Sequence, residues 1–206
     1  MRLYTSPTTP FGRKVVVAIH EAGLADRVTI VDVTGTPIDP GTLPVDRNPL
    51  GKIPALDRDD GGPVYDSRVI CRYLDMVSGG RLYPGVPLLW DTLTMEATAD
   101  GMLDAAVLMV YEARLRPEEL RFAPWVDAQW VKVARALDTL DARESRWTAH
   151  LAGPIDMGQI ALACALAYLD FRHGARDWRA GRPALAVWEA AFAQRPSMIA
   201  TRPPAA

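Results

Sequence analysis

The chain has 206 residues, of which 49% are hydrophobic, with 23 basic and 25 acidic residues. This length suits one large domain or two small ones with an apolar core. The near-neutral charge, without a basic run carrying interleaved aromatics, argues against a nucleic-acid partner. The longest apolar run, residues 160–169, is too short for a bilayer span of about 20 residues. Because the N-terminus also lacks a signal peptide's apolar segment, we expect a cytoplasmic protein without a membrane partner.

The first 78 residues alternate between strand and helix patterns. The predicted strands cover residues 2–5, 28–33, 54–56 and 63–65, and the predicted helices cover residues 11–22 and 67–77. Residues 34–45 carry several prolines and glycines and are predicted to form an irregular loop. The order is βαβ, a loop, and then ββα. This order predicts a thioredoxin-like α/β N-terminal domain over residues 1–78.

Residues 79–87, rich in glycine and proline, are the predicted linker, and everything after them is predicted to be helical. The all-α C-terminal domain should cover residues 88–206. Its predicted helices cover residues 88–114, 125–146, 157–173 and 184–193. Asp156 is the predicted N-cap of the third of these, and we expect the Gln159 side chain to reach back to the Asp156 backbone N–H.

Metal and disulfide chemistry are not expected from this sequence. Cys71 and Cys164 each lie in an apolar helical pattern typical of small buried hydrophobes, which fits a reducing cytosol. His20, His150 and His173 show no ligand spacing, so we predict no metal site. No glycine-rich dinucleotide motif follows the first strand, so we expect no bound cofactor.

Residues 48–56 form the most informative stretch. Pro49 and Gly51 indicate a turn, and Ile53 is held extended by the proline that follows it. Because Pro54 cannot donate to a sheet, the backbone around Ile53 is left to pair with another partner. Asp66 and Ser67 then begin a helix, whose N-terminus is an anion site. An extended edge beside an anion site suits a short peptide with a free carboxylate, such as glutathione.

This stretch resembles the glutathione site of the cytosolic glutathione S-transferases. Residues 6–14, 160–171 and 195–204 resemble other parts of the same family, so the resemblance covers essentially the whole chain. It implies glutathione as co-substrate, a homodimer, and a site in a cleft between the two domains. It also implies a cis Pro54 and glutathione contacts from Phe11, Lys52, Ile53, Pro54, Asp66 and Ser67.

Individual roles follow from the resemblance. The Ile53 backbone would pair with the cysteinyl unit of glutathione. Ser67 would bind the γ-glutamyl carboxylate, and Asp66 would approach the γ-glutamyl amine. The alternative is that Ser67 and Asp66 only cap their helix.

The catalytic candidates are Thr9 and Ser6. In thioredoxin-type folds the redox thiols sit where the first strand meets the first helix, and residues 9–12 have none, which disfavours a disulfide oxidoreductase. A Thr9 hydroxyl could instead donate a hydrogen bond to the glutathione sulfur. Lowering a thiol pKa from about 8.5 by two units is worth about 2.7 kcal/mol. Ser6 is the competing hydroxyl, and the alternative for Thr9 is helix capping alone.

The long helix after the linker is the predicted wall of the electrophile pocket, again by resemblance. Its candidate residues are Met102, Ala106 and Met109, and plain core packing is the alternative. Asp100 and Asp104 lie one turn apart and are interpreted as a solvated or interface feature. In relatives an acidic residue on this helix can reach the glutathione bound by the partner subunit.

The sequence therefore predicts a glutathione S-transferase-like detoxification enzyme. It would activate the glutathione thiolate for attack on a small hydrophobic electrophile. The alternative function is a catalytically weak glutathione-fold binding or scaffold protein.

Overall fold

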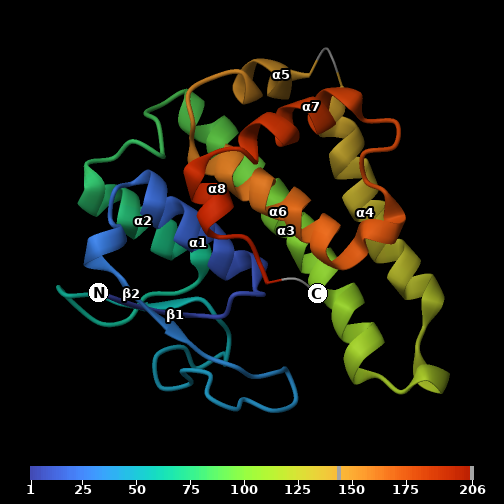
Figure 1. Ribbon diagram of the computed structural model, residues 1–206, viewed down its shortest axis with the longest axis horizontal. Coiled ribbons are helices and arrows are strands. Elements are labelled where there is room, and N and C mark those ends of the chain that lie inside the picture. The colour runs from blue at the N-terminus through green and yellow to red at the C-terminus, as the bar shows by residue number, and fades with distance from the viewer. Residues whose placement is uncertain (143–144, 205–206) are drawn as a thin grey trace. The chain divides into compact units, whose positions relative to one another are not determined.

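The computed structural model describes residues 1–142 and 145–204, and these divide into two compact units. Unit 1 comprises Met1–Leu89 and Pro196–Ala206, and unit 2 comprises Trp90–Arg195. Figure 1 shows the strands only in the first of these, with the remaining fold built from helices. The chain passes from unit 1 to unit 2 between Leu89 and Trp90, and it returns to unit 1 at Pro196.

Unit 1 is built on a small mixed sheet whose strands are β1 (Arg2–Thr5), β2 (Thr29–Asp32) and β3 (Ala55–Asp57). The spatial order is β2-β1-β3, with β1 parallel to β2 and antiparallel to β3. Leu3 of the central strand is fully buried. The parallel pair requires a crossover, and α1 (Pro10–Glu21) supplies it.

The predicted strand at residues 63–65 is wrong as a strand. Only Val64 pairs, in an isolated antiparallel bridge with Leu56. Pro63 has no N–H to donate, and β3 itself has only three residues, so the ladder stops after one pair. The chain then enters α2 (Ser67–Ser78), which packs against α1 and ends at Gly79 with a positive φ of 101°.

The linker and the C-terminal tail both pack on unit 1. The Leu82 N–H donates to Asp75 Oδ1 at 2.6 Å, and Leu82 is buried. The tail contains α8 (Pro196–Ala200), a helix that the sequence patterns did not predict. Arg13 is buried and donates to the Met198 carbonyl at 3.1 Å, so it holds the tail against α1.

Within the described residues, every secondary-structure element of unit 2 is helical. Its main helices are α3 (Leu88–Leu115, which begins in the last residues of unit 1), α4 (Ala123–Asp141), α5 (Arg146–Leu151), α6 (Met157–His173) and α7 (Pro183–Phe192). The described residues also contain three short 3-10 turns, at η1 (Ala25–Arg27), η2 (Glu118–Leu120) and η3 (Gly174–Arg176). Helix α6 is buried on nearly every face, as its uniformly apolar sequence predicts. Helix α7 packs against both α4 and α6.

Two expectations for unit 2 need correction. The helix predicted for residues 125–146 ends at Asp141, and the backbone turns extended at Ala142. Asp141 Oδ1 accepts a hydrogen bond from the Leu185 N–H, so a tertiary contact fixes this end. Residues 143–144 of that prediction lie outside the described residues.

The Gln159 side chain does not reach back to the Asp156 backbone. Asp156 is the N-cap, and its Oδ1 accepts from the Gln159 N–H at 2.9 Å, as predicted. The Gln159 amide instead donates to the backbone oxygens of residues that precede the helix, at 2.8 Å for His150 and 3.2 Å for Pro154. The side chain therefore ties the incoming loop to α6.

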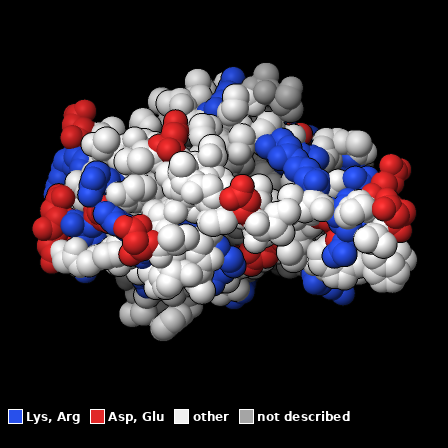
Figure 2. Space-filling view, turned by 90° about the horizontal axis from the view of Figure 1, so that it is seen from below, with Lys and Arg blue, Asp and Glu red and all other residues white. Residues whose placement is uncertain are grey.

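On the face shown in Figure 2, acidic and basic residues are interspersed, and no large area carries one sign of charge. Among the described helices none combines the length and apolarity that a bilayer crossing requires.

Candidate functional site

The first candidate segment lies between β1 and α1. Thr9 is the N-cap position of α1, the position that the capping alternative gave it, and the helix begins at Pro10, one residue before the predicted start. The first backbone bond of the helix runs from the Arg13 N–H to the Thr9 carbonyl at 3.0 Å, which leaves the N–H groups of the first turn without intrahelical acceptors. The Thr9 hydroxyl makes no capping hydrogen bond. Helix capping therefore does not explain why residue 9 carries a hydroxyl.

The hydroxyl of Ser6, the competing catalytic candidate, already has a possible hydrogen-bond partner. Ser6 Oγ lies 3.3 Å from Thr8 Oγ1, at hydrogen-bonding distance. The Ser6 carbonyl accepts from the Thr9 N–H at 3.2 Å, which closes the turn between strand and helix. Ser6 and Thr9 are thus held in one short turn, and Thr9 carries the less engaged hydroxyl.

Thr5 and Gly12 fix how closely this turn approaches the sheet. The Thr5 side chain is buried at the end of β1, and its hydroxyl has no hydrogen-bond partner within the described part of the chain. A Cβ on Gly12 would lie 1.9 Å from Thr5 Oγ1, so only glycine fits there. Sequence reasoning assigned no role to either residue, because the contact joins a strand to a helix and has no local pattern.

The second segment is the turn at residues 48–54, and Asn48 organises it. Asn48 is buried, its Nδ2 donates to the Lys52 carbonyl at 2.8 Å, and its Oδ1 accepts from the Leu50 N–H at 3.1 Å. Gly51 adopts a φ of +60°, a conformation that favours glycine. Sequence reasoning recognised the turn but missed the role of Asn48, which the enrichment of Asn in turns could have indicated.

The Ile53–Pro54 peptide bond is cis, which confirms that prediction. Ile53 lies just before β3, and no backbone hydrogen bond joins it to the residues that the structure describes. Lys52 is exposed at the surface next to it. An extended backbone with unpaired polar groups is a place where a peptide can add as a short strand.

The third segment is the start of α2. Asp66 is the N-cap, and its Oδ1 accepts from the Arg68 N–H at 3.0 Å. Ser67 is the first helical residue and is 2% exposed, whereas Asp66 is exposed. The helix that follows has 12 residues, so its N-terminus presents a partial positive charge to an anion.

The sheet register brings these three segments to the same end of the sheet. Tyr4 lies opposite Ala55 in the antiparallel β1–β3 pair, so the residues after Tyr4 run beside those before Ala55, which places Ser6 near Ile53. Leu56 lies opposite Val64, so the residues after Val64 also run back past Pro54. The turn holding Thr9, the Ile53 backbone and the Asp66–Ser67 cap therefore meet at the same end of the sheet.

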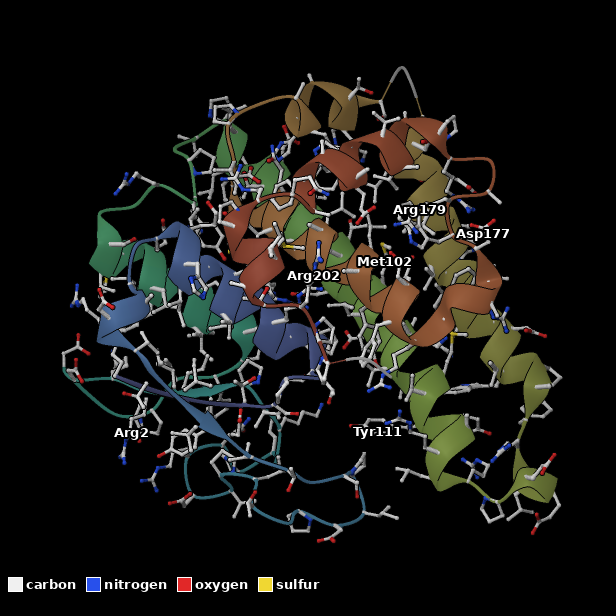
Figure 3. All side chains as sticks on the ribbon, viewed as in Figure 1. Arg2, Met102, Tyr111, Asp177, Arg179 and Arg202 are labelled. Atoms are coloured by element: carbon white, nitrogen blue, oxygen red, sulfur yellow. The ribbon has the colours of Figure 1, made fainter. Side chains whose placement is uncertain are left out.

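The predicted electrophile residues lie on α3, where Figure 3 labels Met102 and Tyr111. Met102, Ala106 and Met109 are all buried. Met109 also lines an open cavity of unit 2, and Met102 and Ala106 are not among the residues that line it. Asp100 is 1% exposed, so it is not a solvated residue, whereas Asp104 is exposed.

Among the described residues no group of three or more His, Cys, Asp and Glu side chains is arranged to hold a metal ion. Cys71 and Cys164 are both buried free thiols. The candidate site therefore consists of hydroxyls, backbone polar groups and a helix N-terminus. Such a site can bind a carboxylate and a peptide backbone, and it can donate a hydrogen bond to a thiolate.

Comparison with known proteins gives the same family for both halves of the chain. Residues 8–77 match the family described as glutathione S-transferase, N-terminal domain, and residues 123–191 match glutathione S-transferase, C-terminal domain. The GST-like protein YibF of Escherichia coli (strain K12) is 31% identical over 210 residues, covering 100% of both chains.

Solved structures of similar sequence come from the same family. A glutathione transferase family member from Pseudomonas fluorescens Pf-5, solved with bound glutathione, is 45% identical with a TM-score of 0.94, over 98% of each chain. A glutathione S-transferase from Methylobacillus flagellatus KT, with glutathione bound, is 35% identical with a TM-score of 0.83, over 98% of this chain and 99% of that one. The predicted thioredoxin-like domain followed by a helical domain is confirmed. The chain belongs to the glutathione S-transferase family, with both the N-terminal and the C-terminal domain of that family.

Proposed function

We propose that this protein binds glutathione at the end of the unit 1 sheet where the three segments meet, and that it activates the glutathione thiol. The observation that carries the proposal is the meeting of three segments at that end: the Ser6–Thr9 turn, the Ile53 backbone and the Asp66–Ser67 cap. Ile53 supplies backbone groups without partners, and the α2 N-terminus suits the γ-glutamyl carboxylate. Phe11, Lys52 and Pro54 complete the proposed contacts, because Phe11 follows the Ser6–Thr9 turn and Lys52 and Pro54 flank Ile53 in the sequence.

The proposed chemistry is thiolate formation followed by attack on an electrophile. A free thiol has a pKa of about 8.5 and is mostly protonated at neutral pH. The Thr9 hydroxyl makes no capping bond, so it is available to donate to the glutathione sulfur, and the α1 N-terminus favours the negative charge. The thiolate sulfur then forms a bond to the electrophilic carbon, and the displaced group leaves or a proton is taken up.

We propose a small hydrophobic molecule as the electrophile. The resemblance assigns Met102, Ala106 and Met109 of α3 to its pocket, and the flexible methionine side chains suit varied substrates. A glutathione transferase family member from Pseudomonas fluorescens Pf-5, 45% identical to this chain over 99% of its length with a TM-score of 0.88, was solved with S-(propanoic acid)-glutathione. That ligand is glutathione with a substituted sulfur, the kind of product that the proposed reaction would form.

Calorimetric titration with glutathione tests the binding part of the proposal. Ser67→Ala should weaken binding at least tenfold because it removes a buried hydroxyl at the anion site. Ser78→Ala, at the other end of the same helix, is the matched control and should bind as the wild type does. Failure of the wild type to bind millimolar glutathione would remove the enzyme proposal and leave the alternative, a binding or scaffold protein on this fold.

We also propose a homodimer in a cytoplasmic setting. Val69 and Met76 lie seven residues apart on α2, and so on one face, and are 48% and 64% exposed. An apolar pair of this kind suits a subunit interface. Light scattering should show a dimer for the wild type and a monomer for Met76→Glu. The two free cysteines fit the reducing conditions in which glutathione is abundant.

A further inference from the structure

Thr5 carries a buried hydroxyl that the proposed chemistry does not use. The residue ends β1 and is 3% exposed, and its backbone is engaged, because the Thr5 carbonyl accepts from the Val33 N–H at 2.9 Å. The Thr5 hydroxyl, however, has no hydrogen-bond partner among the described residues. A buried hydroxyl without a partner costs free energy of folding, so its presence requires a physical reason.

This hydroxyl faces the first turn of α1, beside Thr9. The point where a Gly12 Cβ would stand lies 1.9 Å from Thr5 Oγ1 and 2.5 Å from Thr9 Cγ2. The Thr5 hydroxyl and the Thr9 methyl group therefore face the same small space next to the Gly12 Cα. Because Gly12 has no side chain, the two threonines can approach each other there.

A second rotamer of Thr9 would pair the two hydroxyls. The Thr9 hydroxyl makes no capping hydrogen bond, so no contact with its own helix holds it in its present direction. Rotation about the Thr9 Cα–Cβ bond by one staggered step puts the hydroxyl in place of the methyl group that faces Thr5. The Thr5 hydroxyl can then donate to Thr9 Oγ1, which leaves the Thr9 proton available for another acceptor.

We propose that Thr5 is a positioning residue whose hydroxyl donates to Thr9 Oγ1 and so directs the Thr9 proton toward the glutathione sulfur. This role rests on the proposed function, in which Thr9 acts on the thiol. Thr9 is partly exposed and can contact a ligand, whereas the buried Thr5 acts only through Thr9. The thiol loses its proton to solvent, and Thr9 keeps its own. A hydroxyl that accepts one hydrogen bond is polarised and donates a stronger one to the thiolate.

The pKa of the bound glutathione thiol, measured by the ultraviolet absorbance of the thiolate across pH, tests this role. Thr5→Val keeps the shape of the side chain and removes the hydroxyl. It should raise the thiol pKa by about half a unit to one unit, the effect of one ordinary hydrogen bond. Transfer to 1-chloro-2,4-dinitrobenzene at neutral pH should slow by roughly threefold to tenfold. Thr5→Ser keeps the hydroxyl and should retain most of the rate.

Stability and coupling separate positioning from packing. Thr5→Val should be at least as stable as the wild type in chemical denaturation, because it removes a buried hydroxyl without a partner. In the Thr9→Ala background, Thr5→Val should have no further effect on the thiol pKa, since Thr5 acts through Thr9. Thr29→Val, at an exposed position of β2, makes the same chemical change and should leave the thiol pKa and the rate unchanged.

The Thr9 rotamer gives a readout that does not require turnover. Three-bond couplings between the isotope-labelled Thr9 methyl carbon and the backbone report the χ1 angle, with or without glutathione. Thr5→Val should lower the population of the rotamer whose hydroxyl faces residue 5, because a valine methyl group cannot donate a hydrogen bond to it.

Three results would overturn the proposal. One is a lowered thiol pKa in the wild type that Thr5→Val leaves unchanged. Another is an effect of Thr5→Val that persists undiminished in Thr9→Ala. The third is a Thr9 rotamer population that does not depend on Thr5. A wild-type thiol pKa equal to that of free glutathione would instead remove the proposed thiol activation itself, and the role of Thr5 with it.

Discussion

Asn48 Nδ2 donates a hydrogen bond of 2.8 Å to the backbone oxygen of Lys52. The same side chain accepts a bond from the Leu50 N–H, so one buried amide closes the turn from both sides. This turn leads directly into the cis Ile53–Pro54 bond and the unpaired Ile53 backbone. Asn48 therefore positions the segment that we propose to pair with glutathione without being part of that pairing.

Asn48→Ala should destabilise the protein and weaken glutathione binding together. Loss of the side chain leaves the Lys52 carbonyl and the Leu50 N–H without their partner, at a cost of about 1–3 kcal/mol each if they stay buried. Chemical denaturation measures the stability, and calorimetry measures the binding. Asn48→Asp keeps the acceptor and loses the donor, so it should fall between the wild type and Asn48→Ala. Unchanged binding in Asn48→Ala would show that the turn holds its shape without this side chain.

Thr9→Ala should slow the transfer of glutathione to 1-chloro-2,4-dinitrobenzene, most strongly at neutral pH. A hydrogen bond to a charged group is worth about 1.5–3 kcal/mol, which corresponds to roughly a tenfold to hundredfold loss. The loss should shrink as the pH rises past about 8.5, because the free thiol then ionises without help. Rates measured across pH, followed by absorbance of the thioether product, give this profile.

Thr9→Ser keeps the hydroxyl and should retain most of the rate. Thr8→Ala, which removes an exposed neighbouring hydroxyl, is the matched control. A loss that follows Ser6→Ala and spares Thr9→Ala would assign the role to Ser6 instead. Full activity in the double variant would mean that neither hydroxyl activates the thiol.

Asp156→Ala should be one of the most destabilising substitutions in unit 2. The buried carboxylate caps α6 through the Gln159 N–H and accepts from Thr92 Oγ1 at 2.6 Å, and His150 Nε2 lies 2.8 Å from it. Loss of a buried group with several partners costs about 2–4 kcal/mol. Urea denaturation followed by circular dichroism tests this. Asp141→Ala, which loses a single bond to the Leu185 N–H, should cost less than Asp156→Ala.

His173 should make the folded protein less stable in mild acid. Burial lowers the pKa of His173 below its ordinary value. As the pH falls below about 6.5, the unfolded chain takes up a proton that the folded protein resists, so the free energy of unfolding decreases. The decrease between about pH 7 and pH 5 should be smaller in His173→Gln than in the wild type.

The exposed His20 supplies the control for this pH effect. His20→Gln should show the same decrease in unfolding free energy as the wild type, because it removes an exposed histidine and leaves His173 in place. Chemical denaturation at several pH values measures all three proteins. A wild-type decrease that persists in His173→Gln would mean that other groups control the acid sensitivity.

The sequence predictions were accurate where the interactions join residues that are close along the chain, and they were wrong where the interactions join distant residues. The turn at residues 48–54 and the N-caps at Thr9, Asp66 and Asp156 depend on neighbouring residues, and each was found where the sequence indicated. The cis Pro54 was implied by the family resemblance and is also present. The Gln159 side chain was misplaced because its partners are His150 of α5 and Pro154 of the loop before α6. The end of α4 was misplaced because Leu185 fixes it.

The sequence by itself determined the family, the order of the elements and the segments of the proposed glutathione site, because turn, cap and apolar patterns are local. Only the tertiary structure decided that Thr5 packs against Gly12 and that Arg13 holds the C-terminal tail. These contacts join residues that are distant along the chain. Their pairing is selected by packing and by the burial of polar groups in the folded state, which no local spacing records.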